Sequence, residues 1–165
     1  MESELQTRTA YHEAGHAVLA VLQGAEIESL SIELDWEDAG RERFGATRVR
    51  WPDDAWSERE VAIREVKIAL AGPVAEMIYD GNQYEPEMLH AWQEDWDMAV
   101  ERAGDYLPKS QSLAEYLSRI TYELIRFFER SDVWATVAAL ADQLEAHEAL
   151  GAEEVAVVME AWPIV

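Results

Sequence analysis

Apolar residues recur at helical spacing through most of this chain, and this pattern restricts the possible folds more than any other feature of the sequence. The first such segment, residues 7–23, places apolar side chains on one face and is followed by Gly24, a residue type that commonly ends helices. The same criteria predict further helices over residues 57–79, 94–107, 112–129, 131–147 and 153–161. The chain should therefore fold as a mainly α-helical protein.

Two of these helices begin with a capping box, in which a serine and a glutamate three residues later each satisfy a free backbone N–H of the other. The pairs are Ser57 with Glu60 and Ser112 with Glu115. Gly72-Pro73 should break or bend the first of these two helices, because proline lacks the N–H that a helix interior needs.

Between the first two predicted helices, apolar and polar residues alternate as they do in strands. The alternation covers residues 27–34 and 47–51, joined by a polar, glycine-containing connection at residues 35–43. We expect a small β-hairpin-like element there, within a single domain over residues 1–165. A length of 165 residues, 49% of them hydrophobic, is sufficient for one core.

Acidic residues far outnumber basic ones, with 34 Asp and Glu against 13 Lys and Arg and a formal net charge of -21. This charge repels phosphate backbones and anionic lipid surfaces, so we expect no nucleic-acid partner. No signal-peptide pattern and no bilayer-length apolar run is present, which predicts a cytoplasmic protein without membrane insertion. Because cysteine is absent, metal binding must use histidine and carboxylate side chains.

The segment His12-Glu13-Ala14-Gly15-His16 lies inside the first predicted helix. Histidines four residues apart lie one turn apart on the same helical face, so both imidazoles can bind one metal ion. The adjacent Glu13 can then act on a metal-bound water as general base without being a ligand. Zn²⁺ suits this set best, because it accepts imidazole nitrogen and carboxylate oxygen and leaves one position open for water.

A zinc hydrolase needs a third protein ligand, and the residues themselves leave several choices open. His147 lies in a charged helix end and should be exposed. The remaining candidates are Glu76, His90, Asp95 and Asp97.

Residues 11–17 resemble the zinc-binding helix of the FtsH-type membrane-anchored, ATP-dependent metalloproteases. Further segments resemble that family in the same order, namely residues 29–32, 44–47, 69–79, 94–99, 122–124 and 150–155. The resemblance extends over residues 9–159, and several ordered segments are more specific than the pentapeptide alone.

The resemblance implies a role for each matching residue. His12 and His16 would bind zinc with Asp95 as the third ligand, and Glu13 would be the general base. Glu76 matches a family acid and would orient a ligand histidine or close the site.

The chain also departs from the family pattern. Asp97 has no counterpart, Glu94 stands where the family has asparagine, and Gly72-Pro73 replaces a glycine pair or a glycine followed by a basic residue. The chain lacks the family's ATPase module and transmembrane helix. We therefore expect a free-standing, ATP-independent relative of the protease domain, unless a separate ATPase docks onto it.

The expected function is zinc-dependent hydrolysis of peptide bonds in unfolded or flexible polypeptide segments. The alternatives are a zinc-binding pseudo-protease that acts as a regulatory or interaction module, and an acidic structural protein that binds no metal. A substrate is expected to pair with the free edge of residues 47–51, and the alternative is that these residues form a purely structural hairpin. Trp92 and Trp96 flank Asp95 and either form a wall of the site or pack in the core, while apolar residues near the C-terminus favour a homo-oligomer.

Overall fold

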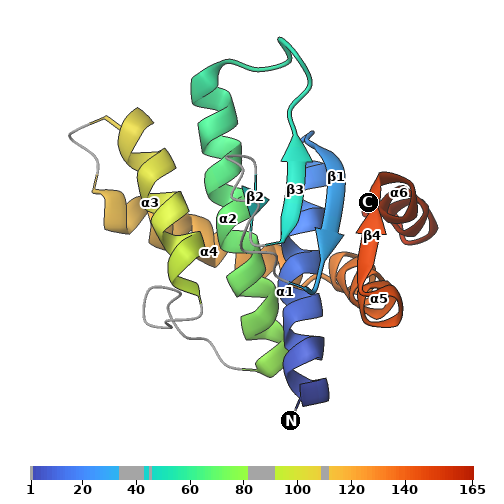
Figure 1. Ribbon diagram of the computed structural model, residues 1–165. Helices are drawn as coiled ribbons and strands as arrows, with labels where there is room; N and C mark the ends of the chain where they lie inside the picture. The colour runs from blue at the N-terminus through green and yellow to red at the C-terminus, as the bar shows by residue number, and fades with distance from the viewer. Residues whose placement is uncertain (1, 34–42, 45, 82–91, 109–111) are drawn as a thin grey trace.

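A computed structural model describes residues 2–33, 43–44, 46–81, 92–108 and 112–165 (Figure 1). The predicted mainly helical fold is confirmed. The described part of the chain contains six helices and four strands: α1 (Glu2–Leu22), β1 (Glu26–Ser31), β2 (Arg43–Phe44), β3 (Thr47–Arg50), α2 (Glu58–Asp80), α3 (Gln93–Tyr106), α4 (Leu113–Phe128), α5 (Ser131–His147), β4 (Ala149–Gly151) and α6 (Ala152–Ala161).

The strands form one antiparallel sheet in the order β2-β3-β1-β4. The predicted strand pair, which lies between the first two helices in the sequence, is present as β1 and β3, with Ile27 opposite Val49. The sheet is larger than predicted, because β4 joins it from a distant part of the chain and pairs Leu150 with Leu30. The predicted free edge at residues 47–51 is wrong at Thr47 and Arg48, because β2 pairs with both of them.

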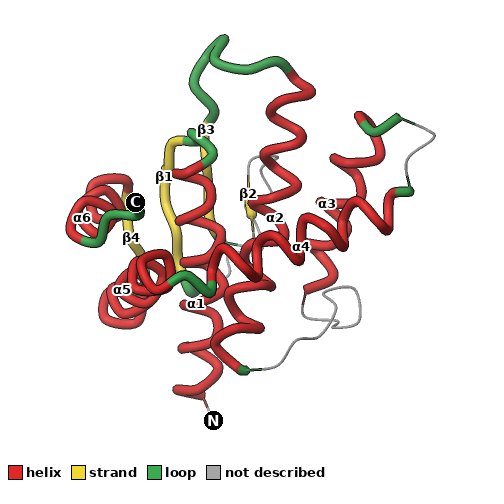
Figure 2. The backbone as a smooth tube through the Cα atoms, turned by 180° about the vertical axis from the view of Figure 1, so that it is seen from behind, coloured by secondary structure: helices red, strands yellow, loops and turns green. Residues whose placement is uncertain are grey.

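Helices α1 and α2 pack closely against each other at the centre of the molecule, with β1 and β3 in front of α1 in Figure 1. A Cβ atom on Gly15 would lie 2.6 Å from the Cβ of Ala75 and 2.7 Å from the carbonyl oxygen of Ala71. Only glycine therefore permits this approach of α1 to α2. Helix α4 crosses α2 on the side that faces away from the viewer in Figure 1, and it therefore lies in front of α2 in the reverse view (Figure 2).

Helix α2 begins with the predicted capping box, in which Ser57 Oγ accepts from the backbone N–H of Glu60 and Glu60 Oε2 accepts from that of Ser57. We expected a break or a bend at Gly72-Pro73, and the helix does not break there, because α2 continues to Asp80 with Pro73 inside it. A proline in a helix interior costs about 3 kcal/mol. Most residues of α2 around Pro73 are fully buried, and their packing offsets this cost.

The buried apolar residues form one contiguous core shared by all six helices and by β1, β3 and β4. No helix in the described ranges combines the length and the apolar character that crossing a membrane requires.

Candidate metal centre

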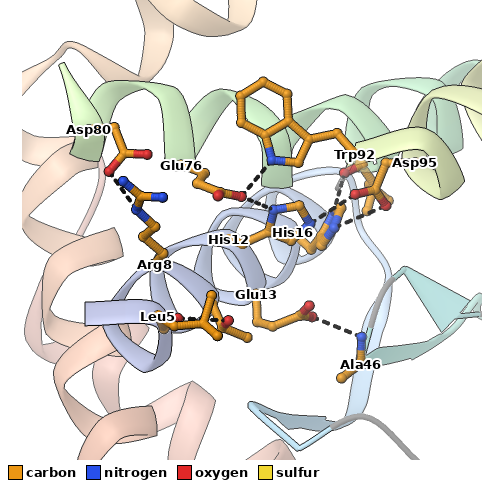
Figure 3. A network of polar contacts seen from close by, with 12 residues as sticks. Leu5, Arg8, His12, Glu13, His16, Ala46, Glu76, Asp80, Trp92 and Asp95 are labelled. Atoms are coloured by element: carbon orange, nitrogen blue, oxygen red, sulfur yellow. Dashed lines mark hydrogen bonds and ion pairs between the residues drawn. The ribbon is translucent and has the colours of Figure 1, made fainter. Parts of the chain in front are cut away.

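Helix α1 places His12 and His16 on the same face, one turn apart, as their spacing predicts (Figure 3). The two imidazole rings meet edge to face, with their centroids 4.8 Å apart. His16 is completely buried and His12 is partly buried. Two polar rings held this closely in the interior require polar partners.

Asp95 supplies such a partner to both histidines. Its Oδ2 lies 2.8 Å from His12 Nε2, and its Oδ1 lies 3.3 Å from His16 Nε2. Asp95 lies in the first turn of α3 and is only 5% exposed. The structure thus brings together the two histidines of α1 and a carboxylate from a different helix.

The other candidates for third ligand lie elsewhere. Glu76, in α2, approaches the opposite side of the His12 ring and accepts a hydrogen bond from Nδ1 at 2.9 Å. Asp97 is exposed and accepts a hydrogen bond of 2.7 Å from the side chain of Gln93. His147 is exposed, as predicted. His90 lies outside the described residues.

Hydrogen bonds to the Nδ1 atoms fix the orientation of both imidazoles. His16 Nδ1 donates to the backbone carbonyl of Ile68 at 2.7 Å, just as His12 Nδ1 donates to Glu76. With both Nδ1 atoms engaged, the Nε2 atoms are the ones available to a metal ion. Such partners hold a ligand histidine in the required tautomer and raise its basicity.

The two Nε2 atoms lie against the backbone of α2 at Gly72. A Cβ atom on Gly72 would lie 2.3 Å from His16 Nε2 and 2.8 Å from His12 Nε2. The imidazoles can therefore approach α2 this closely only because residue 72 has no side chain. Two imidazole nitrogens with a carboxylate are also a donor set that Zn²⁺ prefers, so His12, His16 and Asp95 fit this metal.

Glu13 points towards the start of β3 (Figure 3). Its Oε2 accepts hydrogen bonds from Thr47 Oγ1 at 2.8 Å and from the backbone N–H of Ala46 at 3.1 Å. Among the described residues, Oε1 makes no hydrogen bond. One carboxylate oxygen of Glu13 and one ring nitrogen from each of His12 and His16 lie within 4.8 Å of one another. The carboxylate is therefore anchored through one oxygen beside the histidine pair.

Burial and charge act in opposite directions on the titrating groups. Burial alone lowers the pKa of His12, but the charge and hydrogen bond of Asp95, together with Glu76, raise this pKa well above its usual value. Burial would raise the pKa of Asp95, but His16 and His12 hold that pKa far below its usual range. Without a metal ion, His12 and Asp95 therefore form a buried ion pair.

The pKa of Glu13 is raised above its usual value, because burial outweighs the opposing effects of His16, His12 and the Thr47 hydroxyl. Glu13 is only 3% exposed. A carboxylate with a raised pKa is a stronger base when it is ionised.

Two residues of the site carry contacts that the sequence analysis did not predict. Thr47 holds Glu13, and the indole Nε1 of Trp92 donates a hydrogen bond of 2.6 Å to Glu76. The proximity of Trp92 to Asp95 along the chain was the only signal for it. Thr47 has no comparable signal, because its contact joins positions 34 residues apart.

No family model matches this chain, and no curated protein matches it. The resemblance to the FtsH-type proteases therefore stays a prediction based on the motif segments themselves.

Proposed function

We propose that this protein is a zinc-dependent metalloendopeptidase. One observation carries the proposal: the carboxylate of Asp95 meets the Nε2 atoms of both His12 and His16, with Glu13 beside them. The side chains of His12, His16 and Asp95 would hold the Zn²⁺ ion. A Zn²⁺ ion held there would lower the pKa of a water molecule and polarise the carbonyl group of a peptide.

In this proposal Glu13 is the general base. It takes a proton from water as the water attacks the scissile carbonyl, and then delivers that proton to the leaving amine. Its raised pKa supports both steps, because the carboxylate must first accept the proton and later release it. Thr47 and Ala46 hold one carboxylate oxygen, which orients the other oxygen for this transfer.

The proposed substrates are unfolded or flexible polypeptide segments. The sequence contains no glycine-rich phosphate-binding loop with its lysine, so the proposed cleavage is ATP-independent. Stable substrates would need a separate ATPase to unfold them. The predicted cytoplasmic location and self-association remain part of this proposal.

The test combines metal analysis with hydrolysis of a fluorogenic unfolded protein such as labelled casein. The wild-type protein should contain one zinc per chain and cleave the substrate, and a chelator should abolish cleavage. Glu13→Gln should retain zinc and lose activity by a factor of about 10² or more. Full activity of Glu13→Gln would end the proposed role of Glu13.

A second candidate function is a zinc-stabilised pseudo-protease that serves as a regulatory or interaction module. Its support is the deep burial of the site, since His16, Asp95 and Glu13 are all at most 5% exposed. A closed zinc site can stabilise a fold without catalysis. Stoichiometric zinc without cleavage of any unfolded substrate would favour this second function.

A further inference from the structure

Trp92 occupies the position immediately before α3 and is only 3% exposed. Its indole Nε1 donates to Glu76 Oε2 at 2.6 Å. A buried indole N–H needs such an acceptor, because a buried donor without a partner is destabilising. This hydrogen bond therefore joins the start of α3 to α2.

The same oxygen of Glu76 also contacts the metal centre. Glu76 Oε2 accepts from His12 Nδ1 at 2.9 Å as well as from the indole of Trp92. One oxygen atom thus links the indole to the imidazole. The Glu76 carboxylate cannot turn away from His12 without also giving up its bond to Trp92.

Trp92 is connected to the other side of the metal centre through the backbone. Asp95 follows three residues later, in the first turn of α3. The one polar atom of the Trp92 side chain, the indole Nε1, is committed to Glu76. Anchoring Trp92 on α2 therefore holds in place the turn from which Asp95 reaches His12 and His16.

We infer that Trp92 is a positioning residue that sets metal affinity, by orienting His12 through Glu76 and by fixing the turn that carries Asp95. This inference rests on the proposed zinc site and goes beyond it, because it assigns a role to a residue that touches neither metal nor substrate. Residues that orient metal ligands typically change metal affinity or activity 10- to 100-fold when they are replaced.

The test is the zinc dissociation constant of Trp92→Phe, measured by competition with a chromophoric chelator. Phenylalanine keeps an aromatic ring and removes only the donor and part of the ring area. The matched control is Trp96→Phe, one turn further along α3, where the indole is partly buried against the core and makes no hydrogen bond among the described residues. We expect a loss of affinity of about tenfold or more for Trp92→Phe and less than about twofold for Trp96→Phe.

A double-mutant cycle separates this role from a general effect on packing. If Trp92 acts partly through Glu76, its replacement should weaken zinc binding much less in a Glu76→Ala background than in the wild-type background. Equal losses in the two backgrounds, or equal effects of Trp92→Phe and Trp96→Phe, would overturn the inference.

A nuclear magnetic resonance measurement keeps the inference testable even if Trp92→Phe does not fold. In protein with ¹⁵N-labelled tryptophan, Glu76→Ala should shift one indole N–H resonance and speed its exchange with solvent, and unchanged indole resonances would overturn the inference. Wild-type protein that binds no zinc would overturn the proposed function and this inference together. If Trp92→Phe binds zinc as tightly as a zinc-binding wild type, the inference is overturned and the proposed function is not.

Discussion

Asp95 Oδ2 lies 2.8 Å from His12 Nε2, although the two residues are 83 positions apart in the sequence. The second oxygen of the same carboxylate faces His16. The proposed metal site thus combines ligands from α1 and α3, and each ligand can be tested by its own substitution.

Asp95→Asn should abolish tight zinc binding, because the neutral amide removes the anionic ligand. We expect the dissociation constant to rise more than about a hundredfold, beyond the range found for residues that only orient ligands. The control is Asp97→Asn, two residues further along α3 with its side chain exposed, which should leave zinc binding unchanged. An Asp95→Asn variant that binds zinc like the wild type would show that another group completes the site.

Gly72→Ala tests the close packing of the two histidines against α2. The added methyl group would lie 2.3 Å from His16 Nε2, so it should displace the imidazole and prevent stoichiometric zinc binding. Gly104→Ala is the matched control, because a Cβ atom there has no neighbour within 4 Å. The control should bind zinc normally and gain about 0.5–1 kcal/mol in free energy of unfolding, since alanine favours helix over glycine. Zinc titration of both variants decides the point, and unchanged binding by Gly72→Ala would contradict it.

Thr47→Val tests whether the hydroxyl of Thr47 prepares Glu13 for proton transfer. Loss of this hydrogen bond should lower kcat by roughly tenfold with little change in KM, because the base is less well oriented. The bond also lowers the pKa of Glu13, so its loss should raise that pKa and move the acidic limb of the pH–rate profile to higher pH.

Thr121→Val removes a similar buried hydroxyl, one that bonds to the carbonyl of Leu117 within α4. It should leave both kcat and the pH profile unchanged. An identical pH profile for Thr47→Val and wild type would contradict the role given to Thr47.

Zinc binding should become tighter as pH rises. The pKa of His12 lies well above its usual value and that of Asp95 far below, so near neutral pH the metal must displace a proton from His12. The dissociation constant should then fall about tenfold for each unit of pH below the pKa of His12. Calorimetry in buffers of different ionisation enthalpy measures this release, and a pH-independent affinity would contradict it.

The same ion pair should make the stability of the metal-free protein depend on pH. Because folding raises the pKa of His12, its contribution is complete below the unfolded pKa of about 6.5 and is lost as pH rises through the folded value. Asp95 has a lowered pKa, so its contribution is complete above about 3.9 and is lost in stronger acid. The difference in Tm between zinc-loaded and metal-free protein should therefore grow from pH 6 to pH 8.

Local patterns predicted much of this fold. The spacing of His12 and His16 placed both imidazoles on one helical face, and the Ser57–Glu60 capping box marked the start of α2. Such features depend on residues only three or four positions apart, which is why a single sequence reveals them.

Features that depend on distant contacts were missed or wrongly predicted. The three residues of β4 are too few for a recognisable alternation, and their strand exists because β1 offers a partner. Pro73 continues a helix because packing outweighs the lost hydrogen bond, and that packing comes from other elements. The residues alone left open whether Asp95 or Glu76 lies on the Nε2 side of His12, and only the family resemblance implied Asp95, because this choice follows from where α2 and α3 lie.

The coordination of the bound metal tests the central claim most directly. X-ray absorption at the zinc edge should give one Zn²⁺ per chain with two imidazole nitrogens at about 2.0–2.1 Å and carboxylate oxygen in the same shell. The carboxylate contribution should disappear in any zinc-bound fraction of Asp95→Asn. A spectrum without imidazole scattering, or zinc bound well below one equivalent, would contradict the account.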